Sequence, residues 1–280
     1  MNPGIILALG SALAYGSADF IGGVGSRRHS SLQIVLMGQL TGALVMLVAG
    51  VFIPGTPTSS DFLWAVLAGV GSATGSIFLF RGLARGRMGL VAPISAVVAA
   101  ALPVLVGSAL GERSGWFVWV AMAAALAGVW LVARDTATAE EPRASRSALI
   151  DGCLAGLGFG FLFVALAQIS SEGGLLPIAV NQGTGAALTL IVTMALRQPV
   201  RPTRGVLGWG GVSGALGSTG TLAFMIASGR AGLGMTSVLA SLYPAITVLL
   251  AALVLGEGVG ARQRTGIGVC AVAAATLALA

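Results

Sequence analysis

Long apolar segments alternate with short polar connections along the whole chain. A helix needs about 20 predominantly apolar residues to cross the hydrocarbon core of a bilayer. Ten segments meet that requirement, so the sequence predicts an all-α integral membrane protein with ten transmembrane helices. The predicted spans cover residues 4–24, 32–53, 62–80, 91–110, 115–133, 149–169, 175–196, 206–227, 235–255 and 264–280.

Two of the predicted spans resemble each other. Gly89–Glu112 and Gly234–Glu257 are both apolar, both end in Gly-Glu, and share six identical positions when they are offset by 145 residues. Gly75 and Gly220 match at the same offset, each preceded by a threonine. Repetition on this scale indicates a duplicated chain.

The duplication predicts two halves. We expect a first five-helix repeat over residues 1–133, a polar linker over 134–148 and a second five-helix repeat over 149–280. Because five is an odd number, the second repeat begins on the opposite side of the membrane, which gives two inverted repeats. Inverted repeats of this kind commonly hold a substrate near the bilayer midplane, between the halves.

Composition agrees with a membrane location. Hydrophobic residues make up 56% of the chain and charged residues 9%, whereas soluble domains carry roughly 25% charged residues. The net charge is +6, but the arginines lie between apolar segments instead of on one basic face, so we expect no nucleic-acid partner. One histidine and two cysteines make no haem, zinc or triad set, and we expect no cofactor and no metal. The first segment lacks a preceding basic region, so we expect a retained span and not a signal peptide.

Most of the arginines fall on one side of the predicted membrane. Only Arg113 and Arg230 lie in the loops after even-numbered spans. The loops after odd-numbered spans hold Arg27, Arg28, Arg81, Arg85, Arg87, Arg134, Arg143, Arg146, Arg197, Arg201, Arg204, Arg262 and Arg264. The positive-inside rule then places these loops in the cytoplasm and both termini outside it.

The chain resembles the drug/metabolite transporter superfamily, in particular its EamA-like branch. The likeness rests on the ten predicted spans in two repeats, the first-span sequence ALAYGSADFIGG, the pair Tyr243-Pro244, and the two Gly-Glu endings. It implies transport of a small solute, and relatives carry amino acids, sugars, choline-like cations, nucleotide sugars or toxic metabolites. It also implies cytoplasmic termini, which is opposite to the arginine distribution.

Asp19 is the first candidate site residue. It is an acidic residue well inside the first predicted span, with Tyr15 one helical turn before it on the same face. A carboxylate at that depth costs about 2.5 kcal/mol or more, so it should face a cavity or a partner. It either binds a cation or a coupling proton, forms a structural ion pair, for which Arg81 is a candidate, or extends to the membrane interface near Arg27.

Other polar residues recur at matching places in the halves. Gln39 and Gln182 occupy equivalent positions and either hydrogen-bond between helices or orient a substrate. Ser76, Thr221, Ser237, Ser241 and Tyr243 complete the candidate site, although such hydroxyls also bond their own helix backbone. Pro244 should loosen the ninth span near Ala240. Since the copy in Gly234–Glu257 is the more polar, we expect the ninth span to form a polar wall facing Asp19.

Arg81 and the glutamates at the span ends have several interpretations. Arg81 either binds a substrate carboxylate, pairs with Asp19, or extends to the lipid headgroups. Glu112 and Glu257 are expected to tie the loop at the end of each repeat.

Together these features predict a secondary transporter of a small organic metabolite, amino acid-like or cationic, in a bacterial plasma membrane. Alternating access would use a central cavity lined by spans one, three, four, six, eight and nine. Export and proton coupling are expectations, and a monomer would suffice. A lipid-flipping or scaffold membrane subunit is the alternative. An intramembrane enzyme is not favoured, because the single histidine lies in a loop.

Overall fold

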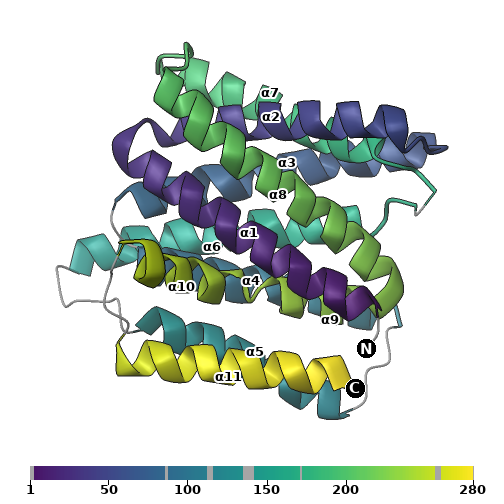
Figure 1. Ribbon diagram of the computed structural model, residues 1–280, viewed down its shortest axis with the longest axis vertical. Coiled ribbons are helices and arrows are strands. Elements are labelled where there is room, and N and C mark those ends of the chain that lie inside the picture. The colour runs from purple at the N-terminus through teal and green to yellow at the C-terminus, as the bar shows by residue number, and fades with distance from the viewer. Residues whose placement is uncertain are drawn as a thin grey trace.

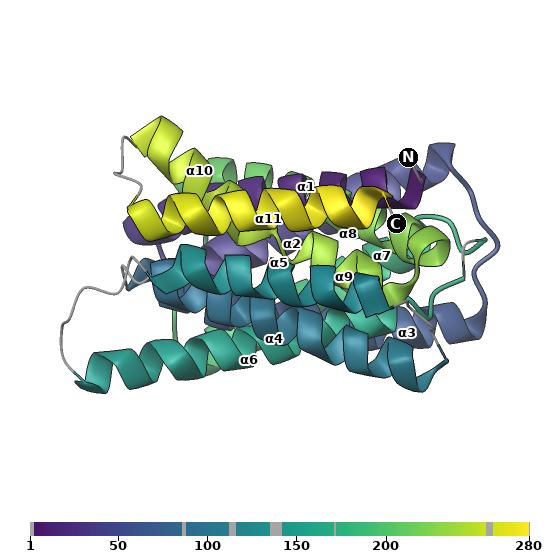
Figure 2. The same ribbon diagram turned by 90° about the horizontal axis from the view of Figure 1, so that it is seen from below.

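The computed structural model describes residues 3–85, 88–111, 116–134, 142–170, 172–255 and 260–279. Within these ranges every regular element is a helix, and the helices form one elongated bundle (Figures 1 and 2). They are α1 (Pro3–Arg28), α2 (Ser31–Phe52), α3 (Ser59–Ala84), α4 (Met88–Ala109), α5 (Trp116–Arg134), α6 (Pro142–Leu166), α7 (Leu176–Ala195), α8 (Arg204–Ala231), α9 (Leu233–Ala240), α10 (Tyr243–Leu255) and α11 (Ala261–Leu279). Residues 135–141 of the linker predicted over 134–148, together with Glu112 and Glu257, lie outside the described residues.

Six helical segments of the described chain are long and apolar enough to cross a membrane. They correspond to the predicted spans one, two, three, six, seven and nine. The other predicted spans coincide with helices α4, α5, α8 and α11, but these do not meet the same criteria within the described residues. The count of ten membrane spans therefore stays a prediction.

The ninth predicted span is two helices instead of one. α9 ends at Ala240 and α10 begins at Tyr243. Pro244 has no backbone N–H, so it cannot donate to the carbonyl of Ala240 one turn earlier. The chain turns here instead, and the Leu242 N–H donates to the Leu239 carbonyl at 3.2 Å. The loosening predicted at Pro244 is confirmed.

The two halves pack across each other. α1 lies alongside α8 in the middle of the bundle (Figure 1), and the two helices run antiparallel, since Gly4 approaches Ala231 and Gly25 approaches Trp209. α6, the counterpart of α1 in the second half, lies antiparallel to α3 in the same way. The first helix of each half thus packs on the third helix of the other.

Small residues allow the closest of these crossings. α2 packs against α8 where Gly38 faces Gly214, and a Cβ atom built on Gly214 would lie 2.5 Å from the Gly38 Cα. No side chain fits between these two backbones. In membranes, such close backbone approach replaces the hydrophobic drive that holds soluble helices together.

Each end of the bundle is tied between the halves. At one end, the Asp61 carboxylate in the first turn of α3 accepts hydrogen bonds from the backbone N–H and the hydroxyl of Thr58. The Asp61 N–H donates back to the Thr58 hydroxyl, which completes a capping box. The Asp61 carboxylate also accepts from the N–H (2.7 Å) and the hydroxyl (3.0 Å) of Ser170, in the loop before α7.

The other end has the equivalent contact with different chemistry. The Nε2 of Gln33 at the start of α2 donates to the carbonyls of Pro199 (2.7 Å) and Arg201 (3.1 Å), in the segment before α8. One end is therefore joined through a carboxylate and the other through a neutral amide.

Candidate functional site

A cavity lies between the halves. Its volume, including the part open to solvent, is about 700 Å³. The lining comes from α1, α2, α3, α6, α7, α8 and α10, and comprises Tyr15, Ala18, Asp19, Ile34, Val35, Gly38, Gln39, Ser72, Ser76, Phe80, Phe159, Leu162, Phe163, Gln182, Ser213, Gly214, Gly217, Thr221 and Tyr243. A cavity of this size suits a small organic molecule.

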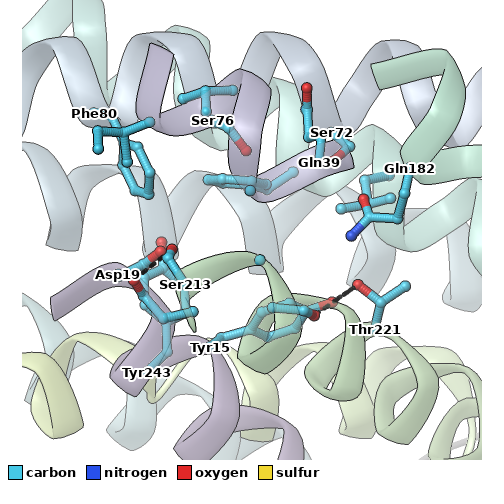
Figure 3. Close-up of a pocket in the computed structure, with 18 of the residues that line it drawn as sticks. Tyr15, Asp19, Gln39, Ser72, Ser76, Phe80, Gln182, Ser213, Thr221 and Tyr243 are labelled. Atoms are coloured by element: carbon cyan, nitrogen blue, oxygen red, sulfur yellow. Dashed lines mark hydrogen bonds between the residues drawn. The ribbon is translucent and has the colours of Figure 1, made fainter. Parts of the chain in front are cut away.

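Asp19 carries the only charge in this lining as described. Its side chain forms no hydrogen bond or ion pair with the described part of the chain, and Figure 3 shows it at one side of the cavity beside Ser213 and Tyr243. The Ser213 hydroxyl donates instead to the carbonyl of Ala18 at 2.9 Å. Because a carboxylate away from water needs a counter-charge or a proton, Asp19 is suited to take up one of them.

Tyr15 lies one turn from Asp19 and extends across the cavity. Its hydroxyl donates to the Thr221 hydroxyl at 3.0 Å (Figure 3), and Thr221 donates to the Gly217 carbonyl. The Tyr15 ring lies against Gly220, and a Cβ atom built on Gly220 would lie 3.0 Å from the ring. The hydroxyl is thus held away from Asp19.

The second half repeats this ring contact without the polar group. The Phe159 ring on α6 lies 2.6 Å from where a Cβ would stand on Gly75, the residue that matches Gly220. Phe163 follows one turn later, at the place that Asp19 holds on α1, and its ring centroid lies 6.0 Å from that of Tyr15. The glycine contacts are shared between the halves, whereas the carboxylate is not.

Gln39 and Gln182 meet where α2 crosses α7. The Gln39 Oε1 accepts a hydrogen bond from the Thr189 hydroxyl at 2.7 Å, while its Nε2 is buried without a partner in the described ranges. Each carboxamide packs against a glycine of the other helix. The Gln182 Nε2 lies 2.5 Å from the position of a Cβ built on Gly42 of α2, and the Gln39 Nε2 lies 2.8 Å from that of a Cβ built on Gly185 of α7. Gln39 thus hydrogen-bonds between helices, and both glutamines line the cavity.

The predicted polar wall on the ninth span is wrong. The Ser237 hydroxyl donates to the Leu233 carbonyl at 2.8 Å and the Ser241 hydroxyl to the Val238 carbonyl at 2.8 Å, and neither serine lines the cavity. Both hydroxyls donate to backbone carbonyls of their own helix, close to where α9 ends. Tyr243 does reach the cavity, and its hydroxyl shares a 3.2 Å hydrogen bond with Ser95 of α4.

Of the alternatives considered for Arg81, pairing with Asp19 is wrong. Arg81 forms an ion pair with Asp151 of α6, which Arg85 joins at 3.2 Å. Asp151 is buried, with a side chain 2% exposed, whereas both arginines remain partly exposed. The Arg81 guanidinium also lies 4.5 Å from the Phe78 ring centroid and does not line the cavity.

The lining differs from the prediction by whole helices. The helices of predicted spans one, three, six, eight and nine line the cavity as expected. α2 and α7 line it as well, whereas no described residue of α4, the fourth predicted span, is among the lining residues. Ser72 and Ser76 of α3 face the cavity (Figure 3). Ser213 lines it without having been singled out. Within the described ranges, no three His, Cys, Asp or Glu side chains gather as they would around a metal ion.

The long apolar helices are those of a multi-pass membrane protein, and an interior cavity lies between its two halves. The sequence model of the EamA-like transporter family matches residues 2–134 and again 146–279. The chain belongs to this family, which is one of transporters within the drug/metabolite transporter superfamily.

Comparison with solved structures supports the fold. One crystal structure, described only as that of a protein, superposes with a TM-score of 0.74 at 17% identity. The match covers 99% of this chain and 96% of the other. At that identity the likeness shows the fold alone. None of the curated proteins matches the chain.

Proposed function

We propose that this chain is a secondary transporter that moves a small organic solute by alternating access through the cavity between its halves. The halves are residues 1–133 and 149–280, each a five-span repeat, and the membrane is a bacterial plasma membrane. The observation that carries the proposal is Asp19, an acidic side chain that faces the interior cavity without a partner in the described structure.

The proposed chemistry at Asp19 is exchange of one positive charge for another. Its carboxylate binds either the charged group of a solute or a proton, and each displaces the other. Apart from Asp19, the titratable side chains among the described lining residues are the phenols of Tyr15 and Tyr243. The remaining helices contribute neutral groups to the lining, so Asp19 is the group that titrates with transport.

Purified protein in liposomes tests this proposal by counterflow, in which an internal solute drives uptake of its labelled form. A panel of amino acids, cationic metabolites and sugars should include a substrate whose uptake depends on pH. Asp19→Asn should lower uptake about a hundredfold, the scale of a buried charge pair that loses one partner. Glu172→Gln is the matched control, because Glu172 is an exposed acidic residue outside the cavity.

Two results would overturn the proposal in different ways. Counterflow of no solute class would favour the lipid-flipping or scaffold alternative. Unchanged pH-dependent uptake by Asp19→Asn would leave transport in place and remove Asp19 from coupling.

The orientation of the chain is tested separately. The arginine distribution places the segment 134–146 in the cytoplasm. A cysteine introduced there, with Cys153 and Cys270 replaced by alanine, should react with a membrane-impermeant thiol reagent only after cells are broken open. Labelling in intact cells would instead support the cytoplasmic termini that the family resemblance implies.

A further inference from the structure

The charges around the cavity limit what it can hold. Asp19 contributes one negative charge, and no arginine, lysine or histidine is present among the described lining residues. Arg81, which follows the lining residue Phe80 on α3, is already bound to Asp151. A solute with one positive charge is therefore neutralised, whereas a carboxylate on the solute would find no counter-charge, and a buried charge without one is strongly disfavoured.

The far side of the cavity offers hydrogen-bond donors. The Oε1 of Gln39 is occupied by Thr189, which leaves the Nε2 as the free group, buried in a residue only 5% exposed. Gln182, on α7, also faces the cavity. A buried N–H without an acceptor costs free energy, and a solute that supplies a carbonyl, ether or hydroxyl oxygen removes that cost.

Aromatic rings separate the two polar ends. Figure 3 shows Asp19 on one side of the cavity and Gln182 on the other, with the Tyr15 ring between them. Phe163 packs at 6.0 Å from Tyr15, and Phe159 also lines the space. Rings of this kind favour an apolar body and a cation close to it.

We propose that the cavity selects organic monocations in which an apolar body separates the amine from a neutral hydrogen-bond acceptor, and that it rejects zwitterions and anions. This inference rests on the proposed transport function. The amine binds Asp19, the acceptor binds the amides of Gln39 and Gln182, and the aromatic rings hold the body between them. Amino acids, which carry a carboxylate, are then poor substrates.

Three probes with one skeleton test the inference by competition and counterflow. Phenethylamine has the amine alone, 4-methoxyphenethylamine adds a neutral acceptor at the far end, and 4-(2-aminoethyl)benzoate places a carboxylate there. We expect the methoxy compound to be taken up about tenfold better than phenethylamine, as for one or two hydrogen bonds. The benzoate should be at least about a hundredfold worse than the methoxy compound.

Variants assign the acceptor site. Gln39→Leu and Gln182→Leu should each remove most of the preference for the methoxy compound while uptake of phenethylamine changes little. Gln198→Leu, at an exposed position in the loop after α7, is the matched control and should keep the preference. The three probes on the unaltered protein form a test that does not depend on any variant folding.

The outcomes separate this inference from the proposed function. Equal uptake of the benzoate and the methoxy compound would overturn the selectivity while leaving a transporter. Transport of other solutes with none of these probes would overturn it as well. A preference for the methoxy compound that survives both glutamine variants would place the acceptor elsewhere and contradict the assignment. Counterflow of no solute at all would instead contradict the proposed function.

Discussion

The contact between α2 and α8 makes a quantitative prediction about stability. Replacing Gly214 by alanine places a methyl group 2.5 Å from the Gly38 Cα and closer still to the Gly38 carbonyl oxygen. Ordinary carbon contacts lie near 3.5–4.0 Å, so the helices must separate by roughly 1 Å. The obstructing atoms belong to the backbone, which cannot rotate away as a side chain does.

The magnitude follows from two opposing effects. Overpacking a close contact costs about 3 kcal/mol, the upper part of the usual range, because both obstructing groups are backbone. Alanine in place of glycine inside a helix returns about 1 kcal/mol. Gly214→Ala should therefore destabilise the protein by about 2 kcal/mol. For a chain of this size that corresponds to a Tm lower by about 5 °C.

Gly208→Ala provides the matched control on the same helix. Nothing lies within 4 Å of a Cβ built on Gly208, so this variant gains the helical preference of alanine without a clash. Thermal unfolding of both purified variants in the same detergent, followed by circular dichroism at the helical band, measures the difference. The packing argument is refuted if Gly214→Ala proves as stable as Gly208→Ala.

Two further predictions concern charged groups near the helix ends. Asp61→Ala removes a carboxylate that accepts four hydrogen bonds from Thr58 and Ser170, and should cost about 2 kcal/mol of unfolding free energy. A wild-type Tm would contradict that role. Arg81→Ala and Arg85→Ala should each cost about 1 kcal/mol, since both arginines are partly exposed and either can pair with Asp151 alone. The double variant should cost about 3 kcal/mol, because it leaves a buried carboxylate unpaired; simple additivity in thermal unfolding would argue against the shared ion pair.

The sequence predicted the features that repeat. Apolar length located the helices, and the duplicated Thr-Gly pairs marked Gly75 and Gly220, which make equivalent contacts with Phe159 and Tyr15. Patterns of this kind are local, or recur at a fixed offset, so one chain is enough to reveal them. Asp19 was also evident, because a single acidic residue in an apolar segment is costly unless something uses it.

The sequence could not predict which distant side chains meet. Arg81 lies 70 residues before Asp151 in the chain, and their pairing depends on how α3 packs against α6. Ser237 and Ser241 had the spacing of a polar face, yet each bonds the backbone of its own broken helix. The place of α2 in the cavity lining follows from the glycines that let it approach α8, a property of two helices together.

The unequal ties at the two ends of the bundle bear on its resting state. A motion that separates α3 from the loop before α7 must break hydrogen bonds to the Asp61 carboxylate, whereas one that separates α2 from the segment before α8 breaks those of the Gln33 amide. Hydrogen bonds to a charged group are worth roughly twice those between neutral groups. If the halves move as proposed, opening the end that holds Asp61 therefore costs more than opening the end that holds Gln33.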